Sequence, residues 1–244
     1  MIKLGKTPYW FDGFNFWARD RLLPHEKERV IYSDDHEPIL RHLCRLAFGL
    51  NRWQGEPDDD DGECWSMGDH SILVAALAGR LALLRGLDAA DVALAVRGGA
   101  VHDLGETLGL GDPAAPWLRG DGSVAFALRV GCARHQAAVD HLAGLHSIVP
   151  DILVGDADRL AAALERRIFF GDDSRDMEHP DAERLIAEIW GSMPQKTADN
   201  FLIHIQATAR TKADALLDLV LGRSGTSVKV RGIPMLADGK AVAL

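Results

Sequence analysis

The 244-residue sequence has little cysteine, few aromatic residues and no excess of positive charge. Its three cysteines, Cys44, Cys64 and Cys132, are far apart and form no Cys-x-x-Cys pair, which argues against a zinc finger and fits a reducing compartment. The net charge of −9 argues against a protein that binds the nucleic-acid backbone non-specifically, because such binding needs a basic face. A nucleotide substrate remains compatible with this charge, since a metal ion and a few arginines can neutralise phosphate locally.

The sequence also lacks the features of a secreted or membrane protein. Aromatic and charged residues occupy the N-terminus where a signal peptide carries an apolar run, and we interpret no stretch as long and apolar enough to span a bilayer. A composition of 47% hydrophobic and 26% charged residues is ordinary for a globular protein with a sizeable core. We therefore expect a cytoplasmic protein without a membrane partner.

Helical periodicity dominates what is present. Apolar residues recur at three- and four-residue steps from Ile39 to Leu50, which predicts an amphipathic helix over residues 36–53. Residues 72–84 are apolar nearly all round and predict a buried central helix closed by Gly86. Asp88 can cap the next helix, which we expect to run to His102 and Asp103. Further helices are expected over residues 121–147, 151–170, 180–190 and 195–221, the last with Pro194 near its start.

Strand-like alternation is scarce until Val228-Lys229-Val230, after which Asp238-Gly239 offers a turn. We therefore predict one all-α domain over residues 31–221. Residues 1–30 form an N-terminal appendage in this interpretation, and residues 222–244 form a short extended or hairpin tail. The acidic stretch over residues 56–63 is expected to be a polar loop between helices.

The pair His102-Asp103 lies in an otherwise small and apolar segment, where an unpaired buried carboxylate is costly. His70 precedes it on another apolar run, and Asp158 follows on a third. Two imidazoles and two carboxylates from different predicted helices suit one divalent ion, whether Mn, Co, Mg, Zn, Fe or Ni. Each of the four residues also has an ordinary structural explanation, as a core histidine, a paired carboxylate or a helix cap.

The order His, His-Asp, Asp resembles the HD-domain metal-dependent phosphohydrolases, which implies a helical bundle of the HD type holding one metal ion. Over residues 30–170 several strings resemble the branch of 5′-deoxynucleotidases and deoxynucleotide triphosphohydrolases more closely. These strings are Asn51-Arg52-Trp53, residues 65–71 (WSMGDHS), residues 102–106 (HDLGE), residues 111–116 (GDPAAP) and residues 157–160 (ADRL). The resemblance also implies a dimer or larger homo-oligomer.

The same resemblance implies roles for residues beside the metal ligands. Glu106 becomes a base or water-positioning residue, and on a helix it would lie one turn from His102. Asp112 would assist at the leaving group or the attacking water, although it lies one residue further from Glu106 than in similar proteins. Arg52 and Trp53 would hold the substrate phosphate and sugar, although their separation from His70 is longer than expected.

Several other assignments stay open at this point. Arg45 competes with Arg52 for the phosphate, and Arg97 and Arg119 are weaker candidates. Asp156 competes with Asp158 as the last ligand, and Asp69 is expected to be a surface or capping carboxylate. His135, His141 and His146 suggest a second metal site, but their spacing does not place all three on one helical face.

We therefore expect a phosphohydrolase that releases phosphate or tripolyphosphate from a deoxynucleotide by attack of a metal-activated water. Two alternatives are kept. One is a nucleotide-binding regulator that retains the fold and the metal but hydrolyses slowly, and the other is a cyclic-nucleotide phosphodiesterase. A small nucleotide is the expected partner, rather than a nucleic-acid polymer.

Overall fold

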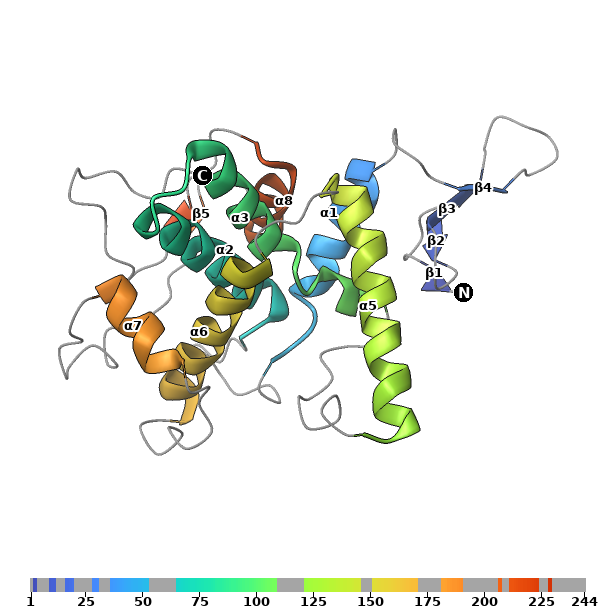
Figure 1. The fold of residues 1–244 in the computed structure, drawn as a ribbon. Coiled ribbons are helices and arrows are strands. Elements are labelled where there is room, and N and C mark those ends of the chain that lie inside the picture. The colour runs from blue at the N-terminus through green and yellow to red at the C-terminus, as the bar shows by residue number, and fades with distance from the viewer. Residues whose placement is uncertain are drawn as a thin grey trace.

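The fold is taken from a computed structural model that describes twelve stretches of the chain (Figure 1). These are residues 2–3, 9–11, 16–19, 28–30, 36–52, 65–108, 121–145, 151–170, 181–190, 206–207, 211–223 and 228–229.

Helices form the body of the protein, which confirms the all-α prediction at that level. They are α1 (His36–Ala47), α2 (Met67–Leu84), α3 (Ala89–Val101), the 3₁₀ helix η2 (Leu104–Leu108), α5 (Ser123–Ala143), α6 (Asp151–Phe170), α7 (Ala182–Trp190) and α8 (Lys212–Leu221). In Figure 1, α2 runs through the middle of the body and packs against α3, α6 and α8. The helix α5 lies to one side, against η2 and α1.

The central helix α2 is buried along nearly its whole length, as the apolar run predicts. It begins at Met67, five residues before the expected start, because Ser66 and Asp69 form a capping box. It ends at Leu84, and Gly86 follows with a positive φ of 73°. Contrary to our interpretation, this 18-residue helix is long and apolar enough to cross a membrane, but the rest of the protein buries 89% of it. Burial of this extent is what a core helix requires.

Several predicted helices are longer than the observed ones, and the reason is clear for two of them. The helix expected over residues 36–53 ends at Ala47, because Asn51 pairs with Ser66 in an antiparallel bridge instead of continuing the helix. The helix expected over residues 195–221 is wrong at residues 206–207, which form strand β5 (Gln206–Ala207). There α8 begins only after Thr211, whose side chain accepts a hydrogen bond from the backbone N–H of Asp214.

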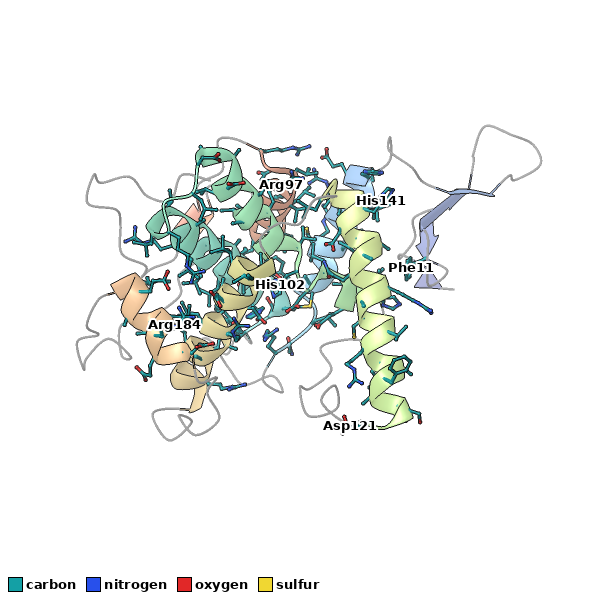
Figure 2. All side chains as sticks on the ribbon, viewed as in Figure 1. Phe11, Arg97, His102, Asp121, His141 and Arg184 are labelled. Carbon is teal, nitrogen blue, oxygen red and sulfur yellow. The ribbon has the colours of Figure 1, made fainter. Side chains whose placement is uncertain are left out.

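Short strands flank the helical body. Near the N-terminus, β1 (Ile2–Lys3), β2 (Tyr9–Phe11), β3 (Phe16–Arg19) and β4 (Glu28–Val30) form an antiparallel sheet in sequence order. Phe11 lies beside α5 in Figure 2. Its buried ring meets the ring of His135 on that helix edge-on, at 5.0 Å between centroids. The predicted strand near residue 228 is present as β6 (Val228–Lys229), and it pairs with β5 upstream. The expected turn at Asp238-Gly239 lies outside the described residues.

One arginine, Arg97, connects the ends of two helices. The guanidinium of Arg97 on α3 donates to the carbonyl oxygens of Val220 in α8 (3.1 Å) and Ala143 in α5 (2.5 Å). Because the last carbonyls of a helix lack partners within that helix, one side chain satisfies part of two helix ends. Arg97, a weak candidate for phosphate binding, therefore has a structural role.

Candidate metal centre

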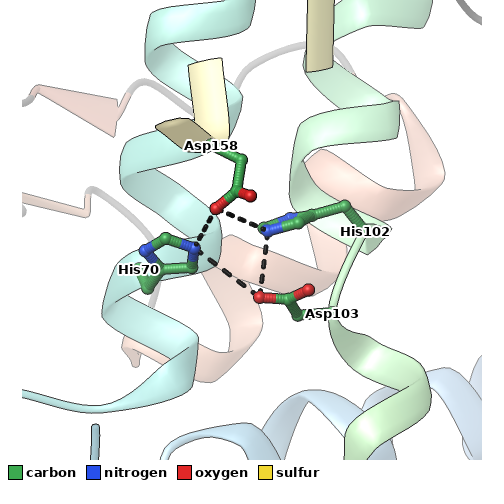
Figure 3. A group of neighbouring side chains, drawn as sticks. All are labelled: His70, His102, Asp103 and Asp158. Carbon is green, nitrogen blue, oxygen red and sulfur yellow. Dashed lines mark hydrogen bonds and ion pairs between the residues drawn. The ribbon is translucent and has the colours of Figure 1, made fainter. Parts of the chain in front are cut away.

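Four predicted ligands meet at one point in the helical body (Figure 3). His70 comes from α2, His102 from the C-cap of α3, Asp103 from the turn that follows, and Asp158 from α6. One potential ligand atom of each residue lies within 4.8 Å of those of the other three. The structure thus brings together residues that are up to 88 positions apart in the sequence.

The facing atoms are imidazole nitrogens and carboxylate oxygens. The Nε2 atom of His70 lies 3.1 Å from Asp158 Oδ1 and 3.6 Å from Asp103 Oδ2. The Nε2 atom of His102 lies 3.0 Å from Asp103 Oδ2 and 3.7 Å from Asp158 Oδ1. The two nitrogens and two oxygens therefore alternate around a common centre, and this mixed donor set suits a borderline divalent ion.

A backbone hydrogen bond sets the orientation of His102. Its Nδ1 atom lies 2.7 Å from the carbonyl oxygen of Gly99, one turn earlier in α3. A carbonyl can only accept, so Nδ1 carries the proton of the neutral ring and the lone pair of Nε2 points toward the centre. This is the tautomer that a metal ligand requires.

His70 is completely buried, and its Nδ1 atom lies 2.6 Å from Oε1 of Glu165 on α6. The indole Nε1 of Trp65 donates to the same carboxylate oxygen at 2.9 Å. Our sequence analysis did not identify Glu165 as part of the site. The available clue was its position seven residues after Asp158, which places both carboxylates on one face of a helix.

The pKa values of the cluster are shifted as expected for groups that face opposite charges. Burial lowers the pKa of His102, but the carboxylates of Asp103 and Asp158 outweigh this effect and raise it well above its usual value. Burial likewise lowers the pKa of His70, as does Arg52, but Glu165 and Asp158 leave it raised. Burial raises the pKa of Asp158, yet hydrogen bonds from both histidines hold it well below its usual value. Without a metal, protons on the imidazoles stabilise the two ionised carboxylates.

Arg52 lies beside this cluster. Its Nη1 atom is 3.4 Å from Asp103 Oδ2, and its Nε atom is 3.5 Å from Glu165 Oε2. The backbone N–H of Arg52 donates to the carbonyl of Trp65, and Met67 donates in turn to Leu50. These bonds fix Arg52 close to the start of α2, so the length of the intervening acidic segment does not set its distance from His70. Trp53 lies outside the described residues.

A glutamine on α5 orders the turn that carries the His-Asp pair. The side-chain amide of Gln136 donates to the carbonyl of Val101 (2.9 Å) and accepts from the backbone N–H of Gly105 (3.0 Å). A Cβ atom at Gly105 would lie only 2.6 Å from the backbone nitrogen of Gln136, so only glycine permits this approach. Sequence reasoning also missed Gln136, because nothing along the chain links it to residues 101–105.

The remaining predicted catalytic and substrate-binding residues are Glu106, Asp112 and Arg45. Glu106 is half-buried in η2 and not in a continuation of α3, so our assumption of an α-helical offset from His102 is wrong. Its charge acts on Cys132 of α5: burial, and next the charge of Glu106, raise the pKa of that thiol. Asp112 lies outside the described residues. Arg45 is exposed on α1, and no ion pair with the four ligands is found for it in the part of the chain that the structure describes.

The rival ligands have structural roles. Asp156 is buried and pairs with Arg85 at the end of α2 (2.8 Å) and with Arg159 on its own helix, so Asp158 is the residue that joins the cluster. Asp69 is the capping carboxylate expected of it, although it is buried, and it also meets Lys212 at 3.1 Å.

The suggested second metal site is not assembled by its described histidines. His135 contacts Phe11, whereas His141 lies near His36, with 6.5 Å between the ring centroids. The four-residue cluster is the only possible metal-binding group among the residues that the structure describes. His146 and Arg119 lie outside them.

Comparisons with known proteins add no family assignment. No protein-family model matches the sequence, and neither the curated proteins nor the solved structures contain a significant match. The residues of the cluster and their geometry are therefore what indicates a function.

Proposed function

We propose that this protein is a metal-dependent phosphohydrolase of the HD type that acts on deoxynucleotides, as a 5′-deoxynucleotidase or a triphosphohydrolase. The observation that carries the proposal is the convergence of His70, His102, Asp103 and Asp158 within 4.8 Å, in the order and chemistry of the HD pattern. These four residues come from three separate helices and one turn, and a shared metal ion would explain why all of them face one point.

The donor set fits one divalent cation. Asp103, Asp158 and Glu165 each carry one formal negative charge, and the neighbouring Arg52 carries one positive charge. The net formal charge of this group is therefore −2 when the imidazoles are uncharged, and a divalent ion would neutralise it. When bound, such an ion would polarise a phosphoryl oxygen and activate a water molecule for attack. Mn, Co, Mg, Zn, Fe and Ni are all compatible with two nitrogen and two oxygen ligands.

The surroundings of the cluster support a small anionic substrate. The Asp158 side chain is 43% exposed, so the cluster is accessible from solvent on that side. Arg52 is only 11% exposed and supplies a positive charge 3.4 Å from a ligand carboxylate. A guanidinium held at this depth can bind a phosphate oxygen next to the metal. The preference for deoxynucleotides is supported by the resemblance of the string Asn51-Arg52-Trp53.

A screen of phosphate release tests this proposal. The protein is incubated with Mn²⁺, Co²⁺ or Mg²⁺ and with matched deoxyribo- and ribonucleoside monophosphates, triphosphates and a cyclic monophosphate. We expect phosphate release from deoxynucleotides to be about ten- to a hundredfold more efficient than from ribonucleotides. A poorer fit of one substrate group in its pocket typically lowers the efficiency by a factor of this size.

The outcomes distinguish the alternatives. Hydrolysis of the cyclic nucleotide alone would favour a phosphodiesterase. Nucleotide binding without hydrolysis under any metal would favour a regulatory protein. Arg52→Ala is expected to raise KM for charged nucleotides, and an unchanged KM would contradict the phosphate role of Arg52.

A further inference from the structure

A buried carboxylate connects the metal cluster to the arginine beside it. Glu165 is completely buried on α6, seven residues after Asp158, and no charge so deep is stable without partners. Its Oε1 atom lies 2.6 Å from His70 Nδ1 and 2.9 Å from Trp65 Nε1, and its Oε2 atom lies 3.5 Å from Arg52 Nε. These partners come from α2, the residues before it, and the segment after α1.

The chemistry of Trp65 identifies the proton donors in this group. An indole N–H can only donate, so Oε1 of Glu165 acts as an acceptor toward Trp65. The positive charge of Arg52 favours the ionised form of the same carboxylate. An ionised carboxylate has no proton to give, and Nδ1 of His70 must therefore donate to it. In the neutral ring that a metal ligand requires, the lone pair of His70 Nε2 is then directed toward Asp103 and Asp158.

We propose that Glu165 is the positioning residue of the metal centre: it fixes the tautomer and orientation of His70 while holding Arg52 next to the ligand Asp103. The same carboxylate thus acts on His70, a candidate metal ligand, and on the guanidinium of Arg52 at the edge of the site. A carboxylate that accepts from the second nitrogen of a ligating histidine makes that imidazole a stronger donor, and losing such a partner commonly costs ten- to a hundredfold in metal affinity. This inference rests on the metal centre of the proposed function but not on its substrate.

The test measures Co²⁺ binding, without any substrate, by titration and by the visible absorption spectrum of the bound ion. Glu165→Gln keeps an acceptor oxygen of the same size but removes the charge, and Glu165→Leu removes both. We expect Co²⁺ affinity to fall about tenfold for the first variant and about a hundredfold for the second. We also expect the absorption bands of the remaining bound ion to shift, because the field of the His70 ligand changes.

Asp156→Asn provides the matched control. Asp156 is another buried carboxylate on α6, and it pairs with Arg85 and Arg159. Within the described part of the chain, no ion pair joins it to any of the four cluster residues. Its loss should lower the melting temperature while leaving the Co²⁺ spectrum unchanged. Trp65→Phe, which removes one donor to Glu165 but keeps the carboxylate against His70, should retain Co²⁺ affinity within a few-fold.

Two results would overturn the inference, and each differs from a failure of the proposed function. Wild-type affinity and spectrum in both folded Glu165 variants would show that the carboxylate does not position His70. Equal weakening in the Asp156→Asn and Glu165→Gln proteins would reduce Glu165 to a general contributor to stability. If Glu165→Leu does not fold, the spectrum of Glu165→Gln decides alone. By contrast, a wild-type protein that binds no Co²⁺ would contradict the metal centre itself.

Discussion

At the scale of single residues, each histidine of the candidate metal site is held in place by a group outside the four-residue cluster. Gly99 accepts from His102, and Glu165 faces His70. Both partners act on the Nδ1 atom, so both histidines present Nε2 to the centre. Because these partners already orient the imidazole, the side chain loses less conformational freedom when the ion binds.

Asp103 is the ligand whose loss should matter most. Its Oδ2 atom lies within 3.6 Å of both histidine Nε2 atoms and within 3.4 Å of Arg52 Nη1. Asp103→Ala is therefore expected to abolish stoichiometric metal binding, because it removes one donor and one negative charge together. Metal analysis after dialysis measures this effect. Asp121→Ala, at an exposed carboxylate before α5, is the control, and equal metal content in the Asp103→Ala and wild-type proteins would refute the ligand assignment.

Glu106 separates metal binding from turnover. It lies three residues after Asp103 in η2, and its backbone N–H donates to the Asp103 carbonyl at 2.9 Å, but it is not one of the four clustered ligands. Glu106→Ala should keep the metal and lose roughly a hundredfold or more in kcat, the usual range for a positioned acid–base group. Phosphate release at saturating substrate gives this value. Near-wild-type kcat would leave Glu106 a structural residue of η2.

At the scale of secondary structure, the site depends on the close approach of α2 and α3. A Cβ atom at Gly99 would lie 2.8 Å from the Cα and 2.9 Å from the nitrogen of Ala75 in α2. Backbone atoms cannot rotate away as a side chain can, so the two helices would have to separate. Gly99 is also the residue whose carbonyl orients His102. Packing between these two helices and the position of one ligand are therefore linked.

Gly99→Ala is expected to destabilise the protein by about 1–3 kcal/mol, the usual cost of overpacking a tight core. Helix propensity alone predicts the opposite, a gain of up to about 1 kcal/mol. Denaturant unfolding of the two proteins decides between these signs. Gly155→Ala is the matched control, because Gly155 lies inside α6 and a Cβ atom there meets only Arg159 Nη1, at an ordinary contact distance of 3.6 Å. A more stable Gly99→Ala protein would contradict the close approach.

The elements also determine what the sequence can predict. The apolar run of α2 and the caps at Asp88 and Thr211 are local features, and the first two allowed α2 and the start of α3 to be anticipated. The convergence of the four candidate ligands could be predicted from their order and from the resemblance. The spacing of Glu165 from Asp158 predicts only that both lie on one helix face. The contacts of Glu165 with His70 and of Gln136 with Val101 could not be predicted, because they depend on which helix faces which. The same holds for the end of α1, where a long-range bridge between Asn51 and Ser66 replaces helical bonds.

At the scale of the whole molecule, the metal centre links α2, the end of α3 and α6, so an ion bound there would tie these parts of the helical body together. A ligand that binds only the folded state stabilises it by about 2.7 kcal/mol at a hundredfold excess over its Kd. For a protein of this length, that corresponds to a rise of roughly 5–10 °C in Tm.

The stabilisation of the fold by a bound ion should increase with pH. The pKa values of His70 and His102 are raised in the folded, metal-free protein, even though burial opposes the rise, so their protons stabilise the fold at low pH and this contribution is lost as pH increases through those values. The pKa values of Asp103 and Asp158 are lowered despite burial, so their contribution is present above the ordinary carboxyl range and is lost on acidification. As the pH falls toward the raised pKa values of the two histidines, the metal-free site takes up protons that an incoming ion must displace.

We accordingly expect the rise in Tm caused by a fixed Mn²⁺ concentration to be larger at pH 8 than at pH 6, with proton release on binding. Thermal melts with and without Mn²⁺ at each pH measure the first quantity, and calorimetric titration in buffers of different ionisation enthalpy measures the second. The Asp103→Ala protein should give no rise at either pH. A rise in Tm that is equal at both pH values in the wild-type protein would mean that the ion binds somewhere other than the two histidines.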